Sequence, residues 1–166
     1  MRYKRFEDLP VWRAGIDLAI RIFAMTAKPA IRGQGGLGDQ IERAAVSVSN
    51  NIAEGFERGT TQELLTFLYI APGSAGEVRS MLCLMERLPC FADFRSEISN
   101  LKSLAEGISR QLRAWANSLQ ESKIKGQRYP TEKARRADMA ARERQEFLQT
   151  LRRIQEEHER EKENKP

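Results

Sequence analysis

The clearest helical pattern in the chain lies in LGDQIERAAVSVSNNIAEGFERG, residues 37–59. Apolar side chains recur there every three or four residues, as in a helix with one face against a core: Leu37, Ile41, Ala44, Ala45, Val48 and Ile52. Polar residues interrupt the middle of this helix, namely Ser47, Ser49, Asn50 and Asn51. Such side chains compete for backbone hydrogen bonds and are poor interior helix formers. We therefore expect specific partners for them, in a polar cluster inside a helical bundle or at a contact between subunits.

Composition indicates a small helical protein with one core. The chain has 166 residues, of which 40% are hydrophobic and 31% charged, and its mean hydropathy is −0.58. The longest charge-free run, residues 64–76, contains Pro and Gly and is too short to span a bilayer. No apolar segment typical of a secretory signal opens the chain. Along a continuous helix Cys83 and Cys90 would lie about 10 Å apart, too far for a disulfide, and a helix end near Pro89 loosens this estimate. We expect reduced thiols, a cytoplasmic protein and no membrane partner.

Periodicity predicts four helices in residues 1–122. The first runs over residues 10–27, with Asp8 near its cap and Pro10 in its first turn. A flexible, glycine-rich connection leads to the second, residues 37–55 or 37–59. The third begins with a capping box of Thr60 and Glu63 and reaches residue 88, before Pro89. The fourth carries a heptad seam between residues 94 and 119. These elements predict an all-α fold, an antiparallel up-and-down four-helix bundle.

The predicted third helix is apolar on more than one side. In a four-helix bundle one side faces the core, so the other side needs a partner. The pattern therefore predicts a homo-oligomer. Pro72, inside this helix, removes one backbone hydrogen bond and should kink it.

Residues 123–166 form a second region, a linker followed by a charged, helix-favouring extension. Its short apolar stripe consists of Phe147, Leu148, Leu151 and Ile154. This region carries 13 Lys/Arg and 9 Asp/Glu, a net charge of +4, whereas residues 1–122 carry 15 and 14, a net charge of +1. A solvated helix and a dedicated binding helix both fit this pattern.

Residues typical of catalysis are nearly absent. The one histidine, His158, lies in the charged extension, so a histidine base or metal site is not expected. Glu54 and Glu77 lack the Glu-x-x-His repeat of bundle metal sites and are interpreted as structural carboxylates. We predict a non-enzyme without cofactor or metal.

Four segments resemble one protein family: FEDLPVW from Phe6, GLGDQIERAA from Gly36, AAVSVSNNIAEG ending at Gly55, and FLYIAPGSAGEV from Phe67. They resemble the four-helix-bundle proteins encoded in intervening sequences of bacterial large-subunit ribosomal RNA genes, related to the accessory variability determinants of diversity-generating retroelements. The resemblance implies a homopentameric ring. It marks Ser47, Asn51, Glu54 and Gly55, with Ser74 and Glu77, as structural motif residues. Ser49, Asn50 and Pro72 depart from the family pattern, and the region after residue 122 has no counterpart in it.

Binding of structured RNA or DNA through its backbone is the functional hypothesis. A sequence pI near 9.5 fits a phosphate-binding surface, and an oligomer repeats each cation around its ring. The candidate contacts are Arg13, Arg21, Lys28, Arg32, Arg43 and Arg58. One branch of the family has no established activity, and the other serves as partner of a reverse transcriptase. The alternative is an oligomeric scaffold that recruits proteins and binds no nucleic acid; salt dependence distinguishes the two.

Overall fold

The computed structural model describes residues 3–32, 36–122, 126 and 132–163. The chain divides into two compact units, residues 1–128 and 129–166. Every regular element in the described ranges is an α-helix or a 3-10 helix, so the predicted all-α class is confirmed. The predicted boundary after residue 122 adjoins positions outside those ranges and stays a prediction.

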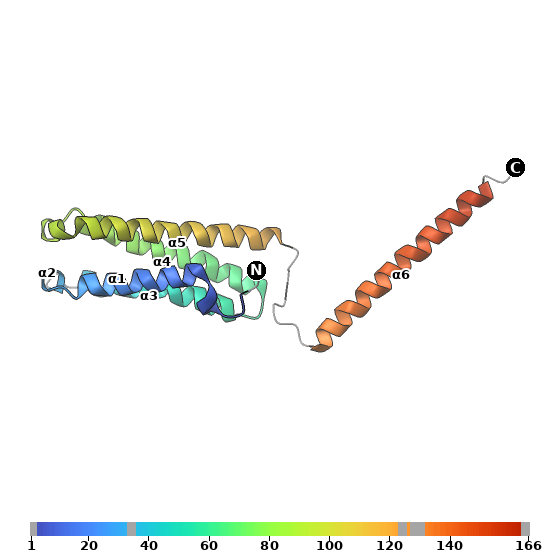
Figure 1. Ribbon diagram of the computed structural model, residues 1–166, viewed down its shortest axis with the longest axis horizontal. Helices are drawn as coiled ribbons and strands as arrows, with labels where there is room; N and C mark the ends of the chain where they lie inside the picture. The colour runs from blue at the N-terminus through green and yellow to red at the C-terminus, as the bar shows by residue number, and fades with distance from the viewer. Residues whose placement is uncertain (1–2, 33–35, 123–125, 127–131, 164–166) are drawn as a thin grey trace. The chain divides into compact units, whose positions relative to one another are not determined.

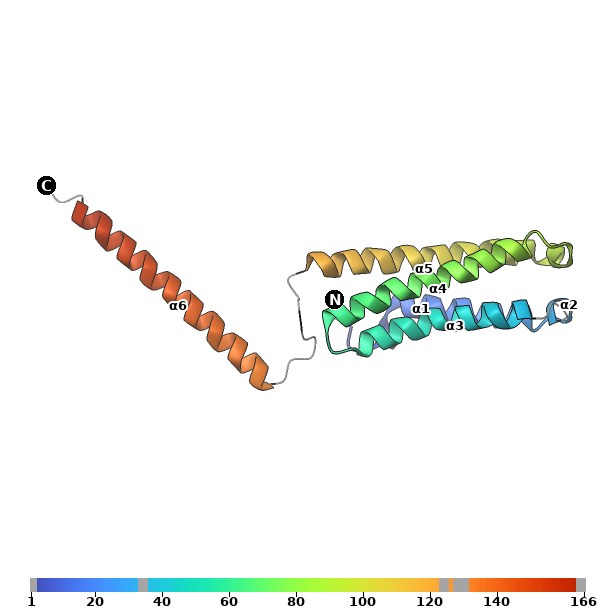
Figure 2. The ribbon, with the colours of Figure 1, turned by 180° about the vertical axis from the view of Figure 1, so that it is seen from behind.

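Four long helices of the first unit lie side by side, and successive ones run in opposite directions (Figures 1 and 2). They are α1 (Pro10–Thr26), α3 (Gly36–Glu57), α4 (Thr61–Met85) and α5 (Arg95–Glu121). Helix α1 packs against α3 and α5, and α4 packs against the same two helices. Each long helix therefore has two neighbours around one core.

The core consists of the apolar stripes that the spacing predicted. On α3 the fully buried side chains include Ile41, Val48 and Ile52. The heptad seam of α5 is buried at its centre, from Ile98 to Leu112, and half-buried at Trp115 and Leu119. Burying stripes of this kind is the main source of helix stability in a protein of this size.

Capping explains where α4 begins. The Glu63 backbone N–H donates to Thr60 Oγ1 at 3.2 Å, and the Thr60 hydroxyl donates to Glu63 Oε2 at 2.8 Å. This confirms the predicted capping box. Helix α4 ends at Met85 rather than at residue 88, and Pro89 instead opens the 3-10 helix η2 (Pro89–Phe94).

Asp8 lies next to the N-cap of α1, as expected, but provides no side-chain cap: it ends the 3-10 helix η1 (Phe6–Asp8), and the N-cap is Leu9. The expected loop from α1 to α3 is wrong in part, because it contains a helical turn. Residues Pro29–Arg32 form the short helix α2, which packs against η2, and Gly36 and Gly38 lie inside α3.

The second unit contains a single long helix in its described part, α6 (Glu132–Glu163). Its composition predicted a helix, and this prediction is confirmed. The large apolar side chains of α6 whose exposure is described are all solvent-exposed: Met139, Phe147, Leu148, Leu151 and Ile154.

Candidate functional site

The polar residues in the middle of α3 form a hydrogen-bonded cluster that reaches α4. The Asn51 side-chain amide donates to the Ser47 carbonyl oxygen at 2.7 Å and to Ser47 Oγ at 3.0 Å. Ser47 Oγ in turn lies 3.0 Å from Ser74 Oγ on α4. Ser74 is buried, whereas Ser47 and Asn51 are half-buried. The cluster therefore satisfies polar groups along the α3–α4 contact, where unpaired groups would cost stability.

The neighbouring polar residues of α3 are used differently. Ser49 is buried, and its hydroxyl donates to the Val46 carbonyl oxygen of its own helix at 3.1 Å. Asn50 is exposed at the edge of a groove. The predicted set thus divides into an α3–α4 cluster, a local backbone bond and a surface amide.

The end of the NIAEG string brings α3 and α4 into close contact. A Cβ atom added to Gly55 would lie 2.6 Å from Phe67 Cβ, so only glycine fits without displacement. One turn away, Arg58 forms an ion pair with Glu54, and its guanidinium carbon lies 5.2 Å from the centre of the Phe67 ring. Gly55 therefore permits the contact, and Arg58 covers the outer face of the same phenylalanine.

The two motif carboxylates, interpreted as structural from the sequence, lie at the surface of the bundle. The Glu54 side chain is 49% exposed, and Glu77 is exposed on α4 without a hydrogen bond or ion pair to any described residue. An exposed ion pair contributes at most about 1 kcal/mol. Removing Glu54 should therefore cost less than removing a member of the Asn51 cluster.

A groove of about 520 Å³ runs along the outer surface of α3. Phe23 of α1 forms one side, and the α3 residues are Asp39, Glu42, Arg43, Val46, Ser47, Asn50 and Asn51. A hollow of about 310 Å³ shares Phe23, Asp39 and Glu42 with it and extends to Arg32. Carboxylates, amides and a guanidinium line one continuous surface beside an aromatic ring. Such a surface can exchange hydrogen bonds with a polar chain.

Two of the predicted nucleic-acid contacts are already engaged by acidic residues. Arg21 is bonded to Glu97 of α5, with an N–O distance of 3.0 Å, and it also lies 3.8 Å from Asp17. Arg13 donates to the Glu7 carbonyl oxygen at 2.7 Å and lies 3.8 Å from Asp8. Binding a phosphate would require both arginines to exchange these partners, so they are weaker candidates than unpaired cations.

The other candidates differ from one another. Arg58 is paired as described above. Lys28 Nζ lies 4.9 Å above the Phe94 ring, and Arg43 donates to the Gln40 side-chain oxygen at 2.6 Å. Arg32 is exposed beside the smaller hollow. Arg32, Arg43 and Lys28 have no carboxylate partner among the described residues, so they remain the most available of the six.

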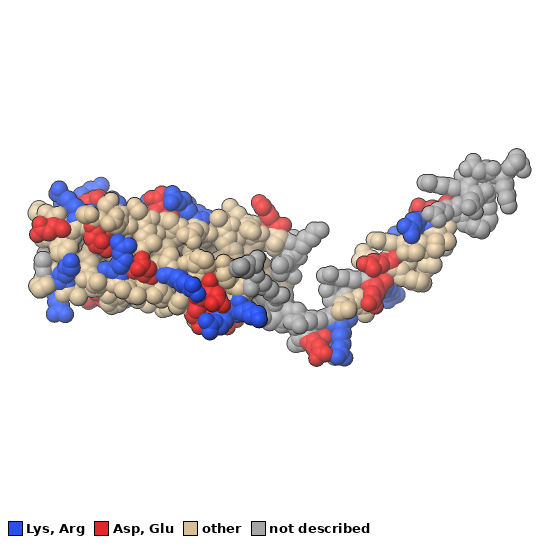
Figure 3. Space-filling view, in the orientation of Figure 1, with Lys and Arg blue, Asp and Glu red and all other residues tan. Residues whose placement is uncertain are grey.

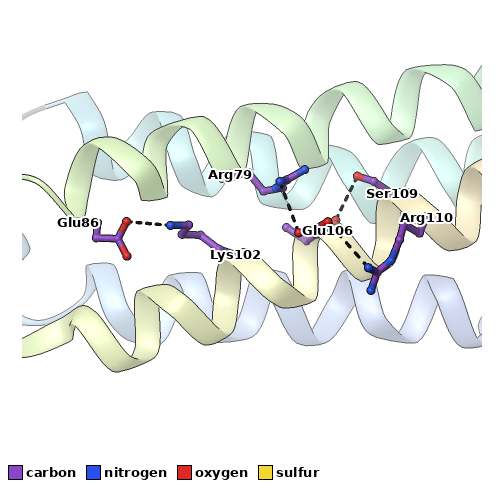
Figure 4. Close-up of polar contacts among 7 residues, drawn as sticks. Arg79, Glu86, Lys102, Glu106, Ser109 and Arg110 are labelled. Carbon is purple, nitrogen blue, oxygen red and sulfur yellow. Dashed lines mark hydrogen bonds and ion pairs between the residues drawn. The ribbon is translucent and has the colours of Figure 1, made fainter.

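Sequence reasoning missed a charged network between α4 and α5 (Figure 4). Lys102 Nζ lies 2.8 Å from a Glu86 carboxylate oxygen, and Glu106 lies between Arg79 at 3.5 Å and Arg110 at 3.9 Å. These residues are far apart in sequence, and only the α5 pair Glu106 and Arg110 shows the i,i+4 spacing that marks a helical ion pair. The cross-helix pairs carry no signal in the sequence.

The Glu86–Lys102 contact perturbs both groups. The hydrogen bond from Lys102 lowers the pKa of Glu86, and nearby Arg87 and Arg95 act in the same direction. The same bond raises the pKa of Lys102. Both side chains are about one-third exposed, 36% and 29% respectively, which indicates a surface pair that orients α5 on α4 rather than a catalytic one.

Cations and carboxylates alternate over one face of the bundle. On the face shown in Figure 3, Lys and Arg side chains lie beside Asp and Glu and form no single continuous basic area.

Large apolar side chains are exposed as well: Ile20 and Phe23 on α1, and Tyr69, Ile70 and Leu84 on α4. The outer side of α4 also carries polar and small residues, so this helix is less uniformly apolar than its sequence suggested.

Among the described residues, no group of three or more His, Cys, Asp or Glu side chains could hold a metal ion. None of the helices in that part of the chain is both long and apolar enough to cross a bilayer. Cys83 and Cys90 are both free thiols.

These features define a helical-bundle protein in which helices α3 and α4 are joined by a polar cluster and a close contact at a glycine. Residues 7–114 match the family model of the 23S rRNA-intervening sequence protein, and the chain belongs to that family. The resemblance drawn from the four sequence segments is thereby confirmed. Its extension to retroelement proteins stays a prediction. No curated protein matches the chain.

Proposed function

We propose that this protein is a non-enzymatic homo-oligomer that binds the backbone of structured RNA. The observation that carries the proposal is membership of a family named for an intervening sequence of 23S rRNA. The exposed cations Arg32 and Arg43, which have no carboxylate partner in the described part of the chain, support it. A bundle that repeats these cations would bind phosphates by multivalency.

The apolar side chains on the outside of the bundle support self-association. Ile20 is 62% exposed on α1, and Tyr69 is 52% exposed on α4. Contiguous exposed apolar patches mark contacts between proteins, and we expect these side chains to lie in such contacts. The proposals of five subunits and of a reverse transcriptase as partner rest on the family resemblance alone.

The RNA proposal is tested by the salt dependence of binding to a fluorescently labelled RNA hairpin. We expect the double variant Arg32→Gln with Arg43→Gln to weaken binding and to lower the slope of log affinity against log salt by about one per lost phosphate contact. The matched control is Arg79→Gln with Arg110→Gln, which removes the same charge from cations already held by Glu106. Absence of binding by the unaltered protein at low salt would refute the proposal.

An oligomeric protein scaffold is the second candidate, and the exposed apolar residues of α1 and α4 favour it. Both candidates require self-association, which light scattering tests directly. A mass equal to the 19.0 kDa of one chain at micromolar concentration would exclude both. A larger mass without RNA binding would favour the scaffold.

A further inference from the structure

Helix α6 presents an apolar face that is solvent-exposed in the described part of its own unit. Phe147 is 62% exposed, Leu148 48%, Leu151 40% and Ile154 53%. Together with Ala137, Ala140 and Arg144, the residues Phe147, Leu151 and Ile154 follow alternating steps of three and four. This is the heptad spacing of a helix that packs lengthwise against another helix. With 32 residues, α6 extends over about 48 Å, enough for a long two-helix contact.

The charge of α6 indicates what kind of partner fits this face. The extension as a whole is basic, but α6 itself holds nine Lys/Arg and nine Asp/Glu, so its excess charge lies outside the helix. A helix without net charge has no general attraction to RNA phosphates or to an anionic membrane surface. An apolar seam flanked by both signs of charge is instead typical of helix–helix recognition.

The charges are also unevenly distributed along the helix. Residues 132–145 contain five Lys/Arg and three Asp/Glu, a net charge of +2, whereas residues 146–159 contain two and four, a net charge of −2. Two copies of α6 aligned in parallel would place like charges together. Two antiparallel copies would place each basic half against an acidic half, which favours that orientation.

Side-chain size points to the same orientation. The large residues of the seam lie in its second half, and the small residues Ala137 and Ala140 lie in the first half. Antiparallel alignment centred between residues 145 and 146 puts Leu151 opposite Ala140 and Ile154 opposite Ala137 of the second copy. Large side chains then meet small ones toward both ends of the seam, which allows close packing, and Phe147 lies opposite Arg144 at its centre. A parallel alignment would instead stack alanine on alanine and leave gaps.

We propose that α6 pairs in antiparallel orientation with the α6 of a second copy of this chain. The contact buries the stripe formed by Phe147, Leu148, Leu151 and Ile154, and it joins two copies through a region outside the matched family segment, residues 7–114. This inference goes beyond the proposed function, because it concerns the extension alone and holds whether or not the bundle binds RNA.

Cysteine cross-linking of the full-length chain tests the pairing. In a background with Cys83→Ser and Cys90→Ser, the double variant Ala137→Cys with Ile154→Cys should form disulfide-linked dimers on mild oxidation. Each single variant should form few, because antiparallel pairing separates identical positions. The matched control is Arg142→Cys with Gln149→Cys. These two positions also lie at the same level in the antiparallel alignment, but heptad spacing places them on the opposite face of the helix.

Three results would overturn the proposal. Equal cross-linking of the single variants would indicate parallel pairing, and equal cross-linking of the control would indicate random collision. Absence of cross-linking in the seam variant would exclude pairing of two α6 helices in this register.

A second measurement does not depend on cysteine chemistry. Leu151→Glu should lower the helical circular-dichroism signal of the full chain and its mass by light scattering, since a helix in a protein gains most of its stability from the packing of its apolar face. Gln149→Glu adds the same charge on the opposite face and should leave both unchanged. Loss of helix in Leu151→Glu without any loss of mass would indicate that the stripe packs within its own chain, which contradicts the proposal.

Discussion

Gly55 on α3 and Phe67 on α4 approach so closely that a Cβ atom at position 55 would lie 2.6 Å from Phe67 Cβ and 3.4 Å from Leu64 Cδ1. Real Cβ atoms do not make contacts as short as the first of these, and its partner is the base of a side chain that cannot rotate away. The separation of α3 and α4 at this level therefore depends on the absence of a side chain at residue 55.

Gly55→Ala should destabilise the bundle by about 1–3 kcal/mol, the usual cost of overpacking. Thermal unfolding followed by circular dichroism measures the change. Gly107→Ala on α5 is the matched control, because a Cβ there meets no atom within 4 Å. The control should be more stable than the original chain by about 0.5–1 kcal/mol, because alanine is the better helix former. Equal effects in the two variants would contradict the close contact.

Asn51→Leu should lower the unfolding temperature, since it removes the amide that donates to both oxygens of Ser47. The expected loss is about 1–3 kcal/mol, typical of a polar group left without its partner. Asn50→Leu, at the exposed neighbouring position, supplies the control and should change stability little. If Asn51→Leu keeps full stability but loses RNA binding, the cluster is a binding site and its structural interpretation is wrong.

Thr61→Val should preserve or raise the stability of the bundle. Thr61 is buried in the first turn of α4, and its hydroxyl oxygen has no hydrogen-bond partner in the described residues. Valine has nearly the same shape, so the substitution removes a desolvated polar atom without leaving a cavity. Thr61→Ala leaves a gap instead and should be less stable than Thr61→Val in urea unfolding. The opposite order would show that the hydroxyl has a partner in solution.

The Glu86–Lys102 pair predicts a stability that depends on pH at both ends of the scale. Because the folded pKa of Glu86 is lowered, its contribution is present above its ordinary value of 4.5 and is lost as the pH falls through the lower, folded value. Because the pKa of Lys102 is raised, its contribution is present below 10.5 and is lost as the pH rises through the higher, folded value.

Glu86→Gln should therefore be less stable than the original chain between these limits and should converge with it at acid pH. Urea unfolding at a series of pH values measures this difference, which should be small because both side chains are partly exposed. A constant difference at every pH would show that the ion pair does not contribute.

Much of the fold and part of the candidate site could be predicted from sequence. The stripe of Ile41, Val48 and Ile52, the α5 seam and the Thr60–Glu63 capping box depend on spacing within one helix, which the sequence contains directly. The association of Ser47 and Asn51 is likewise a four-residue contact. The sequence predicts a polar partner for Ser47 in the bundle but does not identify that partner as Ser74.

Spacing along the chain predicts the long helices, their apolar faces and the distribution of charge on α6, because these are properties of one continuous segment. Which residues meet across helices depends on the packed fold. It placed Glu54 and Glu77 in solvent, paired Arg21 with Glu97, joined Lys102 to Glu86 and brought Gly55 against Phe67. These contacts depend on the rotation and relative height of packed helices. Both are set by how all the side chains of the core fit together, so no single stretch of sequence contains them.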